Sequence, residues 1–368
     1  MARIGLDARM AGSVPTGLDT YAVQLTCALS RLDPDNSYVV IRGPGAAVPL
    51  ASDPNVEEVV LPGDLDTPSN LARGRAISRL DLDLYHSLHH FLPLRLRVRR
   101  VVLTLHDLIW VEHPDLIIDG RFGAIHRTAT HWFGRAAMGY AIRRADHVIA
   151  ISNHTRRRAS VYYGLNSELT SVVHHGVDHR AYTVRVGRSS SSPPYFLVLG
   201  NTRPYKDIPT ALRAFSVCAR RHPEVQLVIA GRGDSARALE TLAASLGIAG
   251  RIRFAGPLPH RDLLDLIHGA TALVFPSLVE GFGLPVLEAM AAGCAVIASR
   301  IPTIVEVVDT AAFLCDARQP DQFAAAMMGL LEDDALRSDL VRRGCDRAAA
   351  FSWERCAAGT LAVYRKLL

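Results

Sequence analysis

Two glutamates, separated by seven residues, flank a glycine-rich segment whose residue types suit a hydroxylated ligand. The segment reads Glu280-Gly-Phe-Gly-Leu-Pro285-Val-Leu-Glu288 and follows a short apolar run. Pro285 suits the first turn of a helix, where the amide hydrogen has no intrahelical partner, so we expect Glu280 in a loop and Glu288 in the helix. A carboxylate can accept hydrogen bonds from two adjacent hydroxyl groups. The alternative is structural, with Glu288 favouring the helix dipole and Glu280 being a solvated loop charge.

Two cations lie in a short segment at the start of the second half of the chain. It reads Gly200-Asn-Thr-Arg203-Pro-Tyr-Lys206-Asp207, after an apolar run and before a helix that Asp207 could cap. Lys206 is one of only two lysines in a chain that otherwise uses arginine, which indicates that a compact ammonium suits this position. The pair could bind a diphosphate and stabilise the charge that develops as it leaves. An ordinary charged surface turn is the alternative.

A third segment, Val101-Val-Leu-Thr-Leu-His106-Asp107, predicts a strand that ends in histidine and aspartate. His106 could hydrogen-bond a sugar hydroxyl, while Asp107 could fix the tautomer of the imidazole or act separately. A structural histidine is an equally good interpretation of this segment taken alone.

A loop from Gly12 to Gly17 follows the first predicted strand and could close over a ligand. No Lys-Ser/Thr pair follows Gly17, which excludes the phosphate-binding loop of ATPases. His86 and His89 belong to a histidine cluster, but the chain lacks the Cys/His or carboxylate spacing of a metal centre. We therefore predict no metal site.

Alternation of Val/Ile/Leu runs with amphipathic stretches predicts that these segments lie on two α/β domains with parallel sheets. Predicted strands cover 2–6, 37–42, 57–61, 83–86, 100–105, 146–151, 170–174, 195–200, 226–230, 251–255, 272–275, 295–298 and 312–315. Predicted helices cover 17–31, 69–79, 121–144, 153–163, 208–221, 235–246, 260–268, 285–292, 320–332 and 335–350. The serine- and proline-rich stretch 183–194 predicts a linker, with domains at 1–184 and 185–350. Such sheets bind ligands at the carboxyl ends of their strands.

The composition, 49% hydrophobic and 21% charged over 368 residues, is that of a folded globular protein. The net charge of +5 is spread evenly, which argues against a nucleic-acid partner. Six scattered cysteines, no apolar run long enough to span a bilayer and no signal-peptide pattern lead us to expect a cytoplasmic protein. Arginine clusters at 95–100 and 156–158 form either a solvated face or a contact with anionic membrane at its inner surface.

Together these segments resemble the family 4 glycosyltransferases, retaining enzymes of the GT-B fold. The hallmark is Glu, seven residues, Glu, which the pair Glu280 and Glu288 matches. Further matching motifs are His106-Asp107-Leu, Ala145-Asp-His-Val-Ile-Ala-Ile-Ser152, His175-Gly-Val-Asp178 and Phe351-Ser-Trp353. The resemblance implies two doubly wound, Rossmann-like domains facing across a cleft. It also implies that segment 351–368 returns to the first domain as a helix at about 355–367.

The resemblance also implies roles for individual residues. Glu288 would accept from the donor ribose, Glu280 would contact the transferred sugar, and Lys206 with Arg203 would bind the diphosphate. Residues assigned to the donor are Gly17, Arg203, Lys206, Glu280, Gly281, Phe282, Gly283, Leu284 and Glu288. Residues assigned to catalysis are His106, Asp107, Arg203, Lys206 and Glu280. Residues assigned to the acceptor are Tyr21, His86 and His89.

The implied reaction moves a hexose from a nucleoside diphosphate sugar to a hydroxyl of a glycan, a lipid-linked glycan or a small molecule, with retention and without metal or other cofactor. The segment from Gly200 to Lys206 is similar to members that use GDP-mannose, and UDP-sugars follow closely. Two alternatives stay open, a sugar-nucleotide epimerase on the same fold and a non-catalytic subunit that binds sugar nucleotides. Loss of a glutamate or of Lys206 would favour the subunit, and none is lost.

Overall fold

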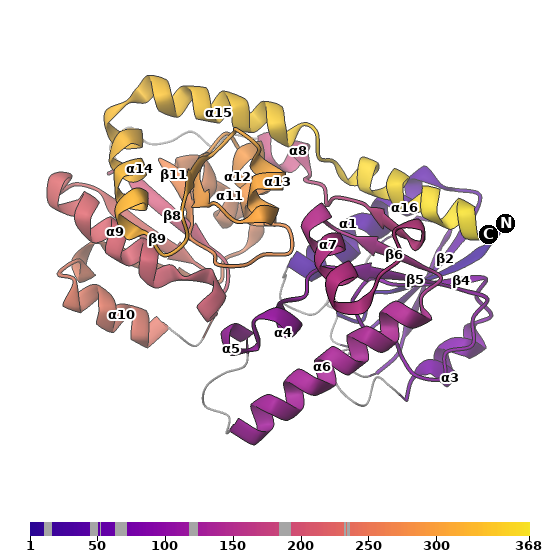
Figure 1. Cartoon of the computed structure of the whole chain (residues 1–368). Coiled ribbons are helices and arrows are strands. Elements are labelled where there is room, and N and C mark those ends of the chain that lie inside the picture. The colour runs from indigo at the N-terminus through magenta and orange to yellow at the C-terminus, as the bar shows by residue number, and fades with distance from the viewer. Residues whose placement is uncertain are drawn as a thin grey trace. The chain divides into compact units, whose positions relative to one another are not determined.

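The computed structural model describes residues 1–10, 17–44, 51, 53–62, 72–117, 124–183, 193–231, 233 and 236–368. Most of the predicted linker at 183–194 and residues 12–16 of the predicted loop lie outside these ranges. The chain forms two compact units (Figure 1). Unit 1 contains Met1–Pro114, Gly120–Gly176 and Phe351–Leu368, and unit 2 contains Asp115–Asp119 and Val177–Ala350.

Unit 1 is built on a seven-stranded parallel sheet with the order β3-β2-β1-β4-β5-β6-β7. Its strands are β1 (Arg3–Asp7), β2 (Ser37–Arg42), β3 (Val56–Val60), β4 (Leu84–Ser87), β5 (Arg100–Leu105), β6 (His147–Ala150) and β7 (Thr170–Val172). The order reverses between β1 and β4, as in doubly wound sheets, because β2 and β3 extend to one side and β5 to β7 to the other.

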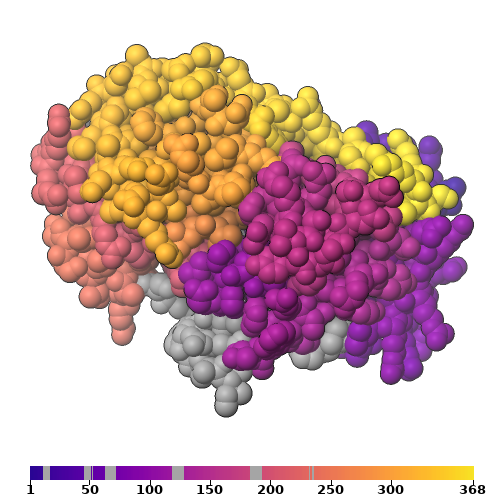
Figure 2. Space-filling view, in the orientation of Figure 1, coloured from indigo at the N-terminus to yellow at the C-terminus, as the bar shows by residue number. Residues whose placement is uncertain are grey.

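The helices of this part of the chain supply the apolar faces that cover the sheet. They are α1 (Gly17–Leu32), α3 (Gly74–Ile77), α4 (Ile109–Glu112), α6 (Ala124–Arg144), α7 (Asn153–Tyr163) and α16 (Trp353–Leu367). The short helix α5 (Pro114–Ile117) belongs mainly to unit 2, which contains Asp115–Asp119. The helix α16 follows unit 2 in sequence but belongs to unit 1, where it packs against α1. In the space-filling view this yellow helix lies beside indigo N-terminal residues (Figure 2).

Unit 2 is built on a six-stranded parallel sheet with the order β10-β9-β8-β11-β12-β13. Its strands are β8 (Tyr195–Leu199), β9 (Gln226–Ala230), β10 (Ile252–Gly256), β11 (Ala272–Phe275), β12 (Ala295–Ser299) and β13 (Phe313–Cys315). Its helices are α8 (His179–Thr183), α9 (Ile208–Arg221), α10 (Ala236–Ser245), α11 (His260–Gly269), α12 (Leu284–Ala291), α13 (Pro302–Val308), α14 (Pro320–Glu332) and α15 (Asp334–Ala348).

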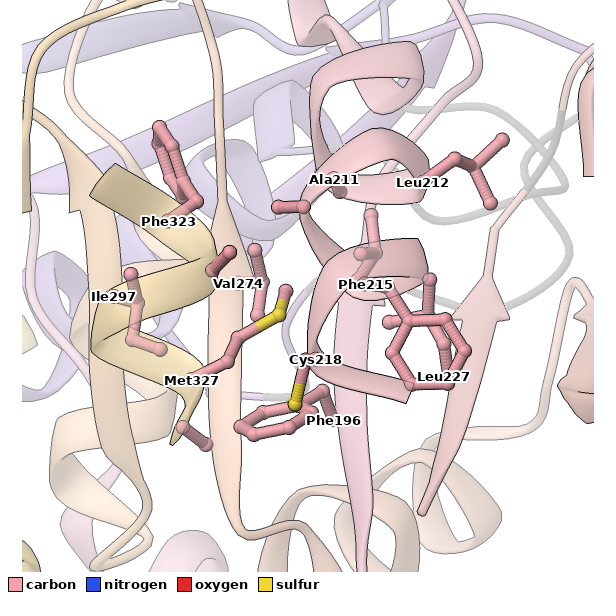
Figure 3. Packing of buried hydrophobic residues seen from close by; sticks show 14 of the residues in the cluster. Phe196, Ala211, Leu212, Phe215, Cys218, Leu227, Val274, Ile297, Phe323 and Met327 are labelled. Atoms are coloured by element: carbon pink, nitrogen blue, oxygen red, sulfur yellow. The ribbon is translucent and has the colours of Figure 1, made fainter. Parts of the chain in front are cut away.

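The core of unit 2 lies where α9 and α14 pack side by side on the sheet. Figure 3 shows Phe196 of β8, Cys218 of α9 and Met327 of α14 pointing toward one another. All three side chains are fully buried. Burial of apolar area on this scale is the main stabilising term of such a domain. This packed core supports the strands whose carboxyl ends lie at the edge of the sheet.

All thirteen predicted strands are present, with ends within two residues of the predicted ones. The units divide between Gly176 and Val177, whereas the predicted boundary is 184. In place of the predicted helix at 69–79, the described residues form α3 and a 3-10 turn at Ser78–Leu80. The helices α4, α5, α8 and α13 were not predicted. They have only four to seven residues, too few for a repeated apolar pattern to identify a helix, so tertiary packing decides them.

Candidate functional site

The glycine-rich segment lies at the carboxyl end of the sheet of unit 2, between β11 and α12. Gly283 precedes α12 with a φ of 102°, and Pro285 occupies the first turn, as predicted. A Cβ at Gly283 would lie 2.5 Å from Ile304 Cδ1, so both its conformation and the space require glycine here. Gly281, Phe282, Gly283 and Leu284 are all buried at the start of α12. In the first turn Pro285 has no amide hydrogen, and the amides of Val286 and Leu287 donate to the carbonyl of Gly283 at 3.0 and 3.3 Å.

Lys206 and Glu280 meet at this edge, although 74 positions separate them in the chain. The 3-10 turn at Pro204–Lys206 follows β8 and places Lys206 Nζ 2.6 Å from Glu280 Oε1. The amide of Leu278 donates to the carbonyl of Tyr205 at 2.8 Å, which ties the two loops together. Lys206 is only 9% exposed, so its charge is largely desolvated. A buried ammonium of this kind needs an anionic partner, which Glu280 supplies.

Two aromatic rings complete the surroundings of the Lys206 ammonium. Its nitrogen lies 4.8 Å from the ring centroid of Phe275 and 5.3 Å from that of Tyr205. Ring faces attract cations within this range. The ammonium is therefore held in one position at the ends of two adjacent strands, β8 and β11.

Glu288 projects from α12 and is paired with a residue that the sequence did not single out. The hydroxyl of Tyr182, in α8, donates a hydrogen bond to the Glu288 carboxylate. Burial raises the pKa of Glu288, and the hydrogen bond from Tyr182 opposes that rise. A carboxylate kept in a desolvated place with a single described partner is a common feature of binding sites. No local pattern could have identified Tyr182, because its partner is remote in sequence.

Arg203 is exposed and does not join this cluster. Its guanidinium donates to the carbonyl of Ile117 at 3.3 Å, and its amide donates to Asn201 Oδ1 at 3.1 Å. Of the predicted donor residues, the structure therefore pairs Lys206 with Glu280, places Glu288 on the adjoining helix α12 and leaves Arg203 on the surface.

The predicted His-Asp pair lies at the carboxyl end of β5 in unit 1. His106 Nε2 hydrogen-bonds the carbonyl of Leu88 at 2.8 Å, and burial lowers the pKa of His106 to about 4. Asp107 Oδ1 accepts from the amide of Ile109 at 2.9 Å, at the start of α4. His106 is thus a neutral imidazole, oriented by a backbone carbonyl. Asp107 accepts a hydrogen bond within the turn that follows and so helps to hold it.

Tyr21 and His86, predicted to contact the acceptor, instead belong to an internal hydrogen-bond network. His86 is completely buried, with Nδ1 2.6 Å from the hydroxyl of Tyr364 and Nε2 2.8 Å from Thr104 Oγ1. The hydroxyl of Tyr21 lies 2.9 Å from the same Thr104 oxygen. Both ring nitrogens of His86 are occupied, so the acceptor role is corrected to a structural one that joins α1, β4, β5 and α16. Pattern alone could not reveal this, because a strand-end histidine looks the same whether buried or exposed.

His89, the third acceptor residue predicted, lies in a group of aromatic rings at this edge. Its ring centroid is 3.8 Å from that of His90 and 6.4 Å from that of His106. Burial and the neighbouring imidazoles lower the pKa of His89 well below its usual range. The ring of Tyr21 stacks on His175 at 4.7 Å. Gly17 begins α1, beside the part of the predicted loop that is not described.

An ion pair at the end of β1 also escaped the sequence analysis. Arg9 Nε and NH2 donate to the two oxygens of Asp7 at 2.8 and 2.6 Å, and the hydroxyl of Tyr85 donates to Asp7 at 2.5 Å. Asp7 is fully buried and Arg9 nearly so. The spacing of an acid and a base two residues apart at a strand end was the available signal.

Across the described ranges, no group of three or more His, Cys, Asp or Glu side chains is arranged to hold a metal ion. In the same residues, no helix combines the length and apolar character needed to cross a bilayer.

Two family models match the chain and together cover most of it. Residues 15–181 match the model described as Glycosyltransferase Family 4, and residues 183–347 match Glycosyl transferases group 1.

Curated relatives come from several kinds of carbohydrate enzyme. O-antigen chain mannosyltransferase B of Escherichia coli is 28% identical over 308 residues, covering 77% of this chain and 74% of the relative. D-inositol 3-phosphate glycosyltransferase of Acidothermus cellulolyticus is 31% identical over 255 residues, covering 64% and 57%. Glycogen synthase of Mycobacterium tuberculosis is 30% identical over 232 residues, covering 62% and 56%. The matches thus span little more than half the length of the last two relatives.

Solved structures with the same fold include sucrose-phosphate synthase from Thermosynechococcus elongatus, with a TM-score of 0.79 at 20% identity over 100% of this chain and 99% of that one. HepE from Anabaena, solved with UDP and glucose, has a TM-score of 0.74 at 18% identity over the whole of both chains. With the two parallel-sheet units, these matches establish the GT-B fold.

Proposed function

The chain belongs to the family 4 glycosyltransferases, and from this we propose that it transfers a hexose from a nucleoside diphosphate sugar to an acceptor hydroxyl with retention of configuration. The observation that carries the proposal is the pairing of Lys206 with Glu280 at the edge of unit 2 where α12, the helix that contains Glu288, begins. Carboxyl ends of parallel strands are where such sheets bind nucleotides.

Each of the three groups matches one part of such a donor. The Lys206 ammonium suits the diphosphate, because a compact, desolvated cation interacts strongly with phosphate oxygens. Glu288 can accept hydrogen bonds from the two ribose hydroxyls, and Glu280 from hydroxyls of the transferred sugar. HepE, which shares the fold, was solved in complex with UDP and with UDP-glucose, and this supports a nucleoside diphosphate donor.

In the proposed reaction the acceptor oxygen forms a bond to the anomeric carbon of the sugar. The bond from that carbon to the diphosphate oxygen breaks on the same face, which gives retention. The proton of the acceptor hydroxyl passes to the departing phosphate oxygen, and Lys206 stabilises the developing negative charge. Neutral His106 in unit 1 can hydrogen-bond a sugar hydroxyl without adding charge. No step requires a metal ion.

GDP-mannose is our first choice of donor, and a UDP-sugar is the second. Two of the relatives are O-antigen chain mannosyltransferases, from Escherichia coli and from Salmonella typhimurium. Their names also support a glycan or lipid-linked glycan as the acceptor.

We also propose peripheral contact with anionic lipid through α6 and α7 of unit 1. Trp132 is 61% exposed, and the guanidinium of Arg135 lies 5.9 Å from its ring. Exposed tryptophan beside arginine is typical of membrane interfaces. In the arginine cluster at 156–158, Arg157 is exposed, whereas Arg158 is paired with Glu112. Trp132→Ser and Arg157→Gln should each reduce binding to anionic vesicles, and equal binding to neutral and anionic vesicles would contradict this contact.

A thermal-shift screen with GDP, UDP, ADP and dTDP, each without added metal, tests the donor assignment. A nucleotide at about 100 times its Kd stabilises the protein by about 2.7 kcal/mol, which moves the Tm by a few degrees. We expect one nucleotide to shift the wild type and not Lys206→Ala. Equal shifts in both proteins would refute the assignment. If no nucleotide and no intact nucleotide sugar shifts the wild type, a non-catalytic role replaces this proposal.

A further inference from the structure

We infer that Tyr182 is a positioning residue for donor binding, which holds the Glu288 carboxylate in the orientation that accepts both ribose hydroxyls. This inference rests on the proposed function. The helix α8 packs against α12 and Tyr182 is buried there, and a hydrogen bond with Tyr182 opposes the rise that burial causes in the pKa of Glu288. Tyr182 is 5% exposed, so water does not compete for this bond.

The backbone around Tyr182 is fixed at several points. Asp178 Oδ1 accepts from the amides of Arg180 and Ala181 at 3.1 and 3.3 Å, which caps α8. His268 Nε2 lies 2.8 Å from the carbonyl of Tyr182, and the ring of His260 meets the tyrosine ring edge-on at 5.8 Å. A five-residue helix is not stable alone. These contacts hold it so that the phenol points at Glu288.

The hydrogen bond also preserves the charge on which ribose recognition depends. Burial favours the protonated carboxyl of Glu288, which would lose acceptor capacity. Tyr182 is the titratable group that acts on Glu288, and it lowers the pKa of that carboxyl. Burial, Glu288 and Asp178 in turn raise the pKa of Tyr182, so the phenol stays protonated and remains a donor. An ionised carboxylate has about four lone-pair sites, so one bond from Tyr182 leaves room for two hydroxyls.

The closing experiment compares each protein's Kd for a ribonucleoside diphosphate with its Kd for the 2′-deoxy analogue of the same base. The ribonucleotide is GDP or UDP, whichever stabilises the wild type, and its partner is the 2′-deoxy form of the same nucleotide. We expect the wild type to prefer the ribonucleotide by about tenfold or more, the value of one hydrogen bond to a charged group. In Tyr182→Phe the preference should fall to a few-fold, through weaker ribonucleotide binding, while the Kd for the deoxynucleotide stays the same. A purely structural role would weaken both equally.

Three further variants and a pH profile sharpen the test. Tyr195→Phe removes another tyrosine hydrogen bond in unit 2, a partly buried one to the carbonyl of Leu266 at 2.8 Å, and should leave the preference unchanged. In a Glu288→Gln background, Tyr182→Phe should have no further effect, because Tyr182 acts through Glu288. As the pH is lowered, Tyr182→Phe should lose ribonucleotide binding at a higher pH than the wild type does.

His268→Ala, which removes the partner of the Tyr182 carbonyl, should lower the preference for the ribonucleotide to a smaller extent.

The outcomes separate this inference from the proposed function. A wild type that binds neither a nucleotide nor an intact nucleotide sugar overturns the proposed function. A wild type that binds but does not distinguish ribose from deoxyribose, or a Tyr182→Phe protein with the wild-type preference, overturns the role of Tyr182. If Tyr182→Phe does not fold, an unchanged preference in His268→Ala overturns it.

Discussion

The carboxyl edges of the two sheets differ in charge, with ionised side chains in unit 2 and mainly neutral imidazoles in unit 1. Unit 2 places one buried cation and two carboxylates there, with Lys206 paired to Glu280 and Glu288 paired to Tyr182. Unit 1 gathers imidazoles, and burial lowers the pKa of His106 to about 4 and of His90 to about 3. At neutral pH the first edge is charged and the second carries neutral rings beside a self-neutralised Asp7–Arg9 pair.

This difference follows from the cost of burying charge. A lysine or glutamate in a desolvated place keeps its charge only with a partner, whereas a histidine can lose its proton and remain a hydrogen-bonding group. A site for a diphosphate needs a permanent cation, and a site for neutral sugar hydroxyls does not. The comparison thus teaches that unit 2 suits the anionic donor and unit 1 an uncharged ligand. Four predictions test this division.

The largest expected effect is that of Lys206→Ala, which removes the permanent cation of unit 2. We expect kcat/KM for the donor to fall by about 10²–10³, or about 3–4 kcal/mol, the usual loss for one charge-stabilising group in an active site. Steady-state kinetics with the identified donor measures this. Lys366→Ala is a matched control, since Lys366 is exposed on α16. Unchanged donor kinetics in Lys206→Ala would contradict the division.

The next effect is a loss of folding stability at low pH, which we expect to come from the buried histidines of unit 1. The pKa of His86 is lowered to about 3 and that of His106 to about 4, below the value of about 6.5 for unfolded histidine. The unfolded chain therefore binds protons first, so stability is intact above about pH 6.5 and falls as pH drops toward 4. The loss is about 1.4 kcal/mol per pH unit for each such histidine. Denaturant unfolding at pH 7 and pH 5 measures it, and equal stability at both would show that these rings are not neutral and buried.

A smaller effect is expected from Tyr364→Phe, which removes the hydroxyl bonded to His86 Nδ1. Loss of one buried hydrogen bond should lower the unfolding free energy by about 1–2 kcal/mol. Nucleotide affinity should stay at the wild-type value, because this network is structural and lies in unit 1. Urea unfolding and the nucleotide Kd together check the prediction. Weaker nucleotide binding with an unchanged unfolding free energy would contradict the structural assignment of this network.

The smallest effect is expected from Glu280→Gln, which keeps the side-chain shape and removes the partner charge of Lys206. Because the ammonium is then less neutralised, the free nucleoside diphosphate should bind a few-fold more tightly, about 1 kcal/mol or less. Sugar transfer should nevertheless fall, because we propose that Glu280 contacts the transferred sugar. Calorimetry of the nucleotide and transfer kinetics give the two readouts. Weaker nucleotide binding would mean that Glu280 does not compete with the diphosphate for the Lys206 ammonium.

By itself the sequence determined the positions of the strands and long helices, because apolar periodicity records which face of a local segment is buried. It also determined the local form of the segment from Glu280 to Glu288, where Pro285 lies in the first turn of α12. Only the tertiary structure decided that Lys206 reaches Glu280, since this depends on β8 and β11 being neighbours in the sheet. The same holds for Tyr182 and Glu288, and for His86, which the sequence placed near a ligand and the fold buried against Tyr364. Residue types and spacing show what a side chain can do, but the partners of a polar group are set by contacts between segments remote in the chain.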